Sequence, residues 1–193
     1  VTDILASTQR LTEATQIYQY KNASPEHPLT MTLRIVNPNF EDGTTGWEND
    51  GMLTQTNTSF PGKSGTTYLE RWVNIGSKVP DVGIRQTLEG IPDGKYRLRA
   101  AVGNIQQNGA NSTVNAGEKQ TGVTLYAGIY DMPVDTMKAH KDLYFTVVDG
   151  QVTIGFKAEN ATGNWICLDN IRLYYLGGNT SEAVSYTHLT LPT

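Results

Sequence analysis

Two stretches of the sequence decide the fold: Ile35-Val-Asn-Pro-Asn-Phe-Glu-Asp-Gly-Thr-Thr-Gly-Trp47 and Asn164-Trp-Ile-Cys-Leu-Asp-Asn-Ile-Arg-Leu-Tyr174. The first predicts a strand, then a turn rich in Asn, Asp and Gly, and then an aromatic anchor. The second alternates as a half-buried strand does, and it carries one acid, Asp169, among apolar residues. Together they predict the opening and the closing strand of one β-domain.

Strand patterns dominate the chain between these two stretches. Gly and Asn turns separate the strands; in Pro92-Asp93-Gly94, proline presets φ and glycine takes the positive-φ position. Asp149-Gly150 predicts a hairpin turn. The predicted strands are Met31–Val36, Thr67–Val73, Gly83–Leu88, Lys95–Val102, Gly122–Tyr130, Lys141–Val148, Val152–Lys157 and Asn164–Leu176. About eight short strands without a second helix indicate an all-β protein, an antiparallel jelly-roll β-sandwich.

The N-terminal residues predict one helix in front of the sandwich. Its apolar residues recur at helical intervals, and prolines 25 and 28 end the pattern. The predicted parts are a helix at 1–22, a linker at 23–29, the sandwich at 30–178 and a tail at 179–193. The helix either docks on the sandwich or ends an upstream helical domain. The second alternative is favoured, because a lone amphipathic helix cannot bury its stripe.

Residues 184–193 (Val-Ser-Tyr-Thr-His-Leu-Thr-Leu-Pro-Thr) break with the pattern that precedes them. They resemble the translation of a transposase-type sequencing adapter. We exclude this segment from the analysis of fold and function, and we expect the chain to be a fragment of a larger protein.

Composition excludes several classes of protein. The net charge is −4 and the basic residues are scattered along the sequence, whereas nucleic-acid binding requires clustered positive charge. No apolar run approaches the roughly 20 residues of a membrane span. A single cysteine, Cys167, excludes an internal disulfide, and its place in the closing strand predicts that it is buried.

Signals of catalysis are weak. Neither His27 nor His140 lies in a nucleophile or metal motif, and the chain has no G-x-S-x-G, H-E-x-x-H, C-x-x-C or P-loop pattern. Nothing in the spacing of the acids places two of them across a cleft, as glycoside hydrolysis requires. The sequence therefore favours a binding module over an enzyme.

The N-P-N-F-E…G-W opening with the closing L-D-N-I-R-L resembles the galactose-binding-like β-sandwich family of carbohydrate-binding modules, over roughly residues 30–177. It is similar in particular to modules appended to bacterial glycan-degrading enzymes. The resemblance implies a secreted or cell-surface, non-catalytic module that holds a catalytic domain of the same parent chain near polysaccharide or oligosaccharide. The alternatives are a structural spacer or interaction domain without sugar affinity, and a divergent enzyme.

The resemblance also implies a structural Ca²⁺. In the family, an acid after the first strand and an acid in the last strand meet at a sandwich edge and hold the ion. Glu41 and Asp169 occupy the matching positions, with the Asn39 carbonyl as a third ligand, and Ca²⁺ takes about six to eight oxygens. The alternative is that both acids cap turns or pair with Arg172 or Lys157. By strand parity, Asp169 is predicted to share one inward face with Trp165, Cys167, Ile171 and Leu173.

Sugar recognition uses aromatic faces against C–H groups and polar side chains against hydroxyls. Trp47 and Trp165 are predicted to be structural. Trp72 shares strand parity with Tyr68 and Glu70, opposite the apolar neighbours, and is therefore predicted to face outward or towards a concave surface of the sheet. The candidate ligand-binding residues are Trp72 as the stacking platform and, as its companions beside a polar loop at 103–120, Tyr68, Arg71 and Asn104.

Overall fold

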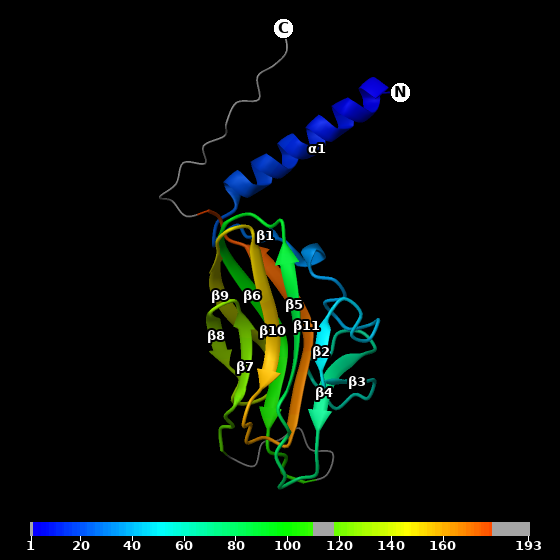
Figure 1. Ribbon diagram of the computed structural model, residues 1–193, viewed down its shortest axis with the longest axis vertical. Helices are drawn as coiled ribbons and strands as arrows, with labels where there is room; N and C mark the ends of the chain where they lie inside the picture. Colours follow the sequence, from blue (N-terminus) through cyan, green and yellow to red (C-terminus); the bar gives the residue numbers. More distant parts are fainter. Residues whose placement is uncertain (1, 110–117, 179–193) are drawn as a thin grey trace.

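The computed structural model describes residues 2–109 and 118–178 of the chain. In these residues two antiparallel sheets pack face to face as a jelly-roll β-sandwich, and one helix projects from one end (Figure 1). The predicted fold class is confirmed. The helix, α1 (Thr2–Asn22), contacts the sandwich through its last turn, where Tyr20 meets Tyr175 edge to face at 5.7 Å.

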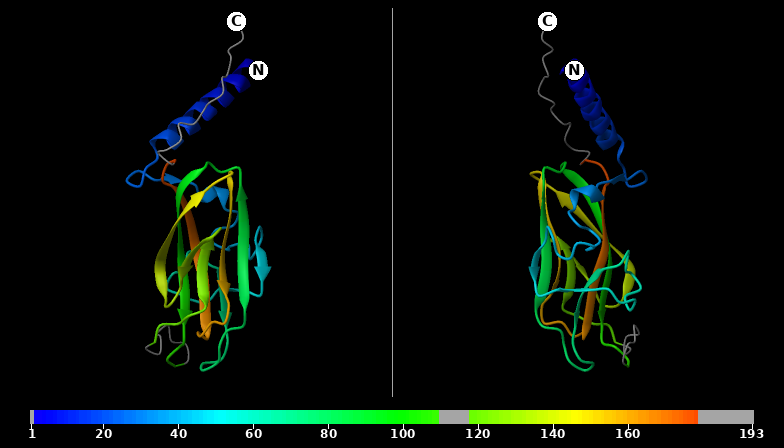
Figure 2. Two further views of the ribbon diagram at one scale, coloured as in Figure 1. Left: turned by 60° about the vertical axis from the view of Figure 1, so that its left-hand side comes forward. Right: turned by 90° about the vertical axis from the view of Figure 1, so that its right-hand side faces the viewer.

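Most of α1 lies away from the sandwich (Figure 2). Ile4, Leu11 and Tyr18 of its apolar stripe are each exposed by about 70 %. The helix therefore does not dock its stripe on the sandwich, and its origin in an upstream helical domain stays a prediction. No helix among the described residues is long and apolar enough to cross a membrane.

The first sheet pairs strands that are distant in sequence. Its order is β3-β4-β11-β6-β9, and β1 also pairs with β11. Its members are β1 (Leu29–Thr30), β3 (Leu53–Gln55), β4 (Tyr68–Trp72), β6 (Gly94–Ile105), β9 (Lys138–Val147) and β11 (Trp165–Tyr175). The closing strand β11 thus lies in the middle of the sheet, and its first residues are buried on both faces because an apolar cluster packs against each.

The second sheet has five strands in the order β2-β5-β10-β7-β8. Its members are β2 (Glu48–Asp50), β5 (Val82–Glu89), β7 (Val123–Ala127), β8 (Tyr130–Pro133) and β10 (Gln151–Ala158). Alternation along β5 and β10 turns every second side chain, such as Ile84 and Phe156, into the core between the sheets. The side chains between them face outward.

A β-bulge in β11 reverses the faces of its side chains. The register against β6 shifts just after Asp169, and Asn170 has a positive φ of 52°. Before the bulge, Cys167 points away from the core between the sheets; after it, Ile171 and Leu173 point into that core. The prediction that Asp169 shares one face with Ile171 and Leu173 is therefore wrong, because the extra residue shifts the alternation.

A second apolar cluster covers the middle of the outer face of the six-stranded sheet. Its members are Phe60, Tyr68, Ala101, Ile105, Trp165 and Cys167. The segment 56–67 crosses the sheet here, with Phe60 packed on Tyr68 at 5.3 Å between ring centroids. Cys167 is buried, as predicted. The two ends of this outer face, beyond the cluster, carry polar and aromatic side chains.

Several predicted element boundaries are wrong. Met31–Val36 is not a strand: β1 ends at Thr30, and a 3₁₀ turn over Thr32–Arg34 follows. The predicted loop at 103–120 begins too early, since β6 continues to Ile105. The strand predicted at 122–130 is divided at Gly128, whose φ of 59° turns the chain from β7 into β8. The short strands β2 and β3 carry no clear alternation, and they were not predicted.

Candidate functional site

A pocket of about 480 Å³ opens on the outer face of the six-stranded sheet, at the end of β4. Its lining joins β3, β4 and β11 with the loops that follow β4 and β6. The lining includes Gln55, Asn57, Glu70, Trp72, Gln107 and Trp165. The pocket therefore combines two indole rings with amide groups and a carboxylate.

Trp72 presents its ring to solvent at this pocket. The side chain is 47 % exposed, whereas Trp47 and Trp165 are buried. The Trp72 indole N–H donates to Gln107 Oε1 at 2.7 Å, and Asn164 Nδ2 donates to the same oxygen at 3.0 Å. These hydrogen bonds fix the plane of an exposed ring. The outward orientation predicted for Trp72 agrees with its place in the structure.

Glu70 accepts hydrogen bonds from three donors at the base of the pocket. Its Oε2 accepts from the Trp165 indole at 2.7 Å and from the Tyr68 hydroxyl at 3.0 Å, and its Oε1 accepts from Gln55 Nε2 at 3.1 Å. Burial raises the pKa of Tyr68 far above its ordinary value, so the hydroxyl stays a neutral donor. The carboxylate is held rigidly and retains acceptor capacity towards the pocket.

The structure places the predicted ligand residues differently from one another. Trp72 lines the pocket, but Tyr68 is fully buried beneath it and supports Glu70. Asn104 is fully buried in β6, where its amide donates to the Val134 carbonyl at 2.8 Å. Arg71 lies on the opposite side of β4 from Trp72, as strand alternation requires. These two side chains therefore do not line the pocket.

The pocket also contains Glu70, Gln107 and Gln55, for which the sequence patterns predict no binding role. One signal for Glu70 was present, since it shares strand parity with Trp72. Gln107 and Gln55 carry no such signal, because their approach to the pocket depends on where β3 and the end of β6 meet β4 and β11.

The predicted metal-binding acids do lie close together. Asp169 is fully buried; its Oδ2 accepts from the Ser64 N–H at 2.6 Å, and its Oδ1 is buried without a hydrogen-bond partner. Glu41 Oε1 accepts from the N–H groups of Thr66 and Thr67 at 2.9 and 3.1 Å. Burial, and to a lesser degree the charge of Glu41, raises the pKa of Asp169 to about 7. One short segment thus wraps both carboxylates.

These residues fit a calcium ion. An unpartnered buried carboxylate oxygen beside a second carboxylate is the kind of all-oxygen donor set that Ca²⁺ prefers. No group of three or more His, Cys, Asp or Glu side chains gathers among the described residues, so main-chain oxygens would complete the set. The predicted alternative ion pairs do not form: Arg172 donates to Asn39 Oδ1 at 2.6 Å, and Lys157 pairs with Glu159. Glu41 does cap the turn at residues 66–67.

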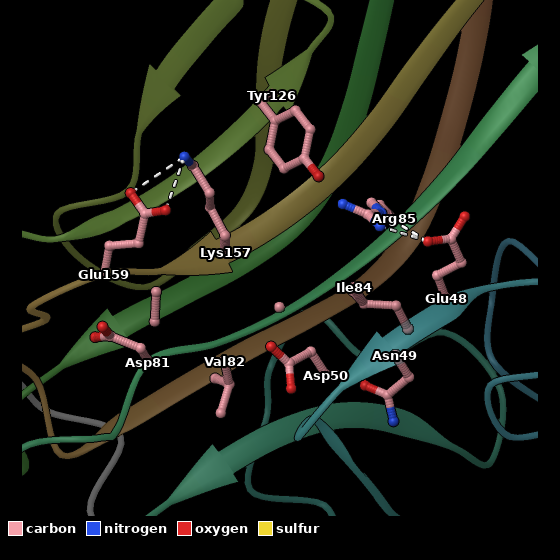
Figure 3. A pocket seen from close by; sticks show the side chains of 12 residues that line it. Glu48, Asn49, Asp50, Asp81, Val82, Ile84, Arg85, Tyr126, Lys157 and Glu159 are labelled. Carbon is pink, nitrogen blue, oxygen red and sulfur yellow. Dashed lines mark hydrogen bonds and ion pairs between the residues drawn. The ribbon is translucent and has the colours of Figure 1, made fainter.

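A second groove, also of about 480 Å³, lies on the outer face of the five-stranded sheet (Figure 3). Tyr126 faces Gly155 across the strand pair, and a Cβ at Gly155 would lie 2.5 Å from the tyrosine ring. Arg85 binds Glu48 through two hydrogen bonds of 2.8 and 2.6 Å, and Lys157 Nζ lies 5.8 Å from the Tyr126 centroid. No sequence pattern predicts this groove, because it depends on the register between β7 and β10.

No protein-family model and no curated protein matches this sequence. The fold matches that of TmCBM61 in complex with β-1,4-galactotriose, at a TM-score of 0.53 and 18% sequence identity, over 72% of this chain and 95% of that one. It also matches a cyclase from Fischerella sp. TAU, at a TM-score of 0.54 and 16% identity, over 79% of this chain and 100% of that one.

A further match is the Stig cyclase Fisc from the same source, in complex with (3Z)-3-(1-methyl-2-pyrrolidinylidene)-3H-indole. Its TM-score is 0.52 at 15% identity, over 79% of this chain and 100% of that one. At such identities the likeness shows the fold alone. That β-sandwich fold is shared by TmCBM61 and by the Stig cyclase Fisc, two proteins of different function.

Proposed function

We propose that this chain is a non-catalytic carbohydrate-binding module and that the Trp72 pocket holds the sugar. The observation that carries the proposal is the exposed Trp72 ring, whose plane is fixed from behind by Gln107. A half-exposed tryptophan contributes less to folding than a buried one, because less of its apolar area leaves water. Held in one orientation, it offers a flat face for the C–H groups of a sugar ring.

The polar groups of the pocket complement sugar hydroxyls. Glu70 is already bound by three donors, so it accepts a hydrogen bond from a hydroxyl without reorganising. The Gln55 and Asn57 side chains line the same wall. With one carboxylate and no Lys or Arg in its lining, the pocket suits a neutral sugar.

The lining of the pocket bears on one class of catalysis. Among the described residues that line the pocket, Glu70 is the sole acid. Glycoside hydrolysis uses two carboxylates that flank the scissile bond, and here a second one is missing. A binding module of a secreted or surface protein would instead keep a catalytic domain of its parent chain close to polysaccharide, by raising the effective local concentration.

We propose further that Glu41 and Asp169 hold a structural Ca²⁺ together with main-chain oxygens, among them the Asn39 carbonyl. When bound, the ion supplies positive charge beside two carboxylates. The chain itself brings the acids together from the opening turn and from β11, and the segment 63–67 closes over both through its N–H groups. The site would thus fasten the start of the sandwich to its closing strand.

A glycan array followed by affinity electrophoresis of the full chain tests the binding role. Trp72→Ala should weaken binding to the glycans found by about 1–3 kcal/mol, the cost of removing an interface anchor. Tyr126→Ala, the matched aromatic variant on the opposite sheet, should leave binding unchanged. If Tyr126→Ala weakens binding and Trp72→Ala does not, the sugar binds in the groove on the five-stranded sheet, beside Tyr126 and Gly155. Absence of binding to any glycan would favour the spacer alternative.

A further inference from the structure

Basic side chains line one end of the outer face of the six-stranded sheet. Lys95, Arg97 and Arg99 alternate on the outward side of β6, and Arg172 of β11 lies beside Arg99 in the register. We call these four residues the basic strip. Three of the four stand at alternate positions of β6, and the pairing of β6 with β11 adds Arg172.

Arg97 lies between two tyrosines in the strip. Its guanidinium carbon is 4.5 Å from the ring centroid of Tyr174 on β11, and Tyr144 on β9 is its register partner on the other side. Tyr144 is 58 % exposed. The Nε of Arg97 is buried without a hydrogen-bond partner, and among the described residues no acid forms an ion pair with it. Arg97 is therefore a cation flanked by rings; its charge helps to lower the pKa of Asp142, but no direct ion pair joins the two.

The other arginines of the strip are already engaged. Arg99 binds Asp142 on β9 through two bonds of 2.6 and 2.7 Å, which lowers the pKa of Asp142 and keeps it ionised. Arg172 donates to Asn39. Asp142 is the acid that faces these cations from β9, and the buried Asp169 on β11 interacts with Arg172. Four cations against two carboxyl groups still leave an excess of positive charge, on a chain whose net charge is −4.

We propose that the basic strip binds an acidic polysaccharide, a chain of sugars that carry carboxylates. An arginine binds a carboxylate through two parallel hydrogen bonds, and Arg97 with the neighbouring Lys95 is placed to do so. The rings of Tyr144 and Tyr174 supply the faces on which the sugars stack. Tyr144, Arg97 and Tyr174 lie on three adjacent strands, so the distance across the sheet from one tyrosine to the other is about 10 Å.

The charge spacing of the strip favours a uronate chain over a nucleic acid. Double-stranded DNA carries one charge for about every 1.7 Å of its axis and is bound by clustered cations. Asp142 lies among the cations of the strip, and its negative charge would repel a dense row of phosphates. A polysaccharide with one carboxylate per sugar ring has more widely spaced charges, which need not lie beside Asp142. Specificity would thus rest on widely spaced charges between stacking faces.

The strip is separate from the Trp72 pocket and does not depend on it. Arg97 and Ile105 are eight residues apart on β6, roughly 26 Å along the strand, and the pocket lies beyond Ile105. The apolar cluster under the segment 56–67 lies between the two. The strip would thus hold an acidic chain whether or not a neutral sugar occupies the pocket.

Affinity electrophoresis of the full chain in gels containing polygalacturonate, without calcium, tests the proposal. Wild type should be retarded, and about 1 M NaCl, where the Debye length is about 3 Å, should abolish the retardation. Arg97→Gln and, separately, Lys95→Gln should each weaken binding by about tenfold. Lys157→Gln on the opposite sheet removes the same charge and should change nothing, and Trp72→Ala should change nothing either.

Three results would overturn the proposal. Equal retardation by the neutral methyl ester of polygalacturonate would remove the role of charge. Equal weakening by Arg97→Gln and Lys157→Gln would show diffuse attraction rather than a strip. Tighter binding of a DNA oligonucleotide in the same buffer would assign the strip to polyphosphate. Lys95 is exposed, so its variant keeps the test valid if Arg97→Gln fails to fold.

Discussion

Replacing Glu70 with glutamine should destabilise the domain although the two side chains have the same shape. In either orientation of the new amide, its NH₂ group faces a donor. At the Oε2 position it meets the Trp165 indole, which only donates; at the Oε1 position it meets Gln55 Nε2. Gln55 cannot turn its amide over without cost, because its oxygen already accepts from the N–H groups of Thr56 and Asn57.

The magnitude follows from this conflict. Hydrogen bonds to a charged acceptor contribute about 1.5–3 kcal/mol each, against about 1 kcal/mol for neutral ones. Losing the charge and leaving one donor unpaired should therefore cost about 2–3 kcal/mol of unfolding free energy. For a domain of this size each kcal/mol lowers the melting temperature by about 2–4 °C, so a fall of about 4–12 °C is expected.

Thermal denaturation followed by circular dichroism measures this effect. Glu89→Gln is the matched control, since Glu89 is an exposed acid at the end of β5, and it should melt as the wild type does. The Glu70 variant should also bind glycans more weakly, because the acceptor of the pocket has lost its charge. A melting temperature for Glu70→Gln within one or two degrees of the wild type would refute the hydrogen-bond network described here.

Three further predictions concern other parts of the molecule. EDTA should lower the melting temperature, since an ion at a hundredfold excess over its Kd contributes about 2.7 kcal/mol to stability. Asp169→Ala should abolish that response. A wild type whose melting temperature does not respond to EDTA contradicts the calcium site. Arg99 lowers the pKa of Asp142 in the folded state, so the ion pair stabilises the fold above pH 3.8, the ordinary pKa, and this contribution is lost as the pH falls below that value. In urea denaturation at a series of pH values, Arg99→Gln should reduce the loss of stability in this acidic range. An unchanged pH profile would refute the prediction. Gly155→Ala should lower the melting temperature, because the new Cβ would lie 2.5 Å from Tyr126 and 2.6 Å from the main-chain oxygen of Ile84; an unchanged value would contradict this close packing.

The fold was predictable because its determinants are local. Alternating strands and turn residues carry the sandwich, and the closing strand is marked by apolar residues on both faces. The outward face of Trp72 also follows from strand parity alone. The prediction from strand parity is wrong beyond Asn170, where a single bulged residue reverses the alternation of side chains. The sequence pattern did not indicate this bulge.

The candidate sites were only partly predictable, because they depend on which strands become neighbours. Asp169 and Glu41 are 128 residues apart in the sequence, and their proximity was expected from a family resemblance rather than from spacing. Asn104 looked like a residue of a polar loop, yet β6 extends through it and buries it. Lys95, Arg97 and Arg99 alternate in the sequence itself, whereas the place of Arg172 and Tyr174 beside them depends on the register of β11 against β6.

Acrylamide quenching of tryptophan fluorescence tests the central claim most directly. Of the three tryptophans, Trp72 is 47 % exposed, while Trp47 and Trp165 are 8 % and 2 % exposed, so the accessible emission comes from the proposed platform. We predict that a neutral oligosaccharide found to bind will protect this emission from acrylamide, with a concentration dependence that matches its Kd. Saturating binding with unchanged quenching would contradict the account, because the sugar would then sit elsewhere on the molecule.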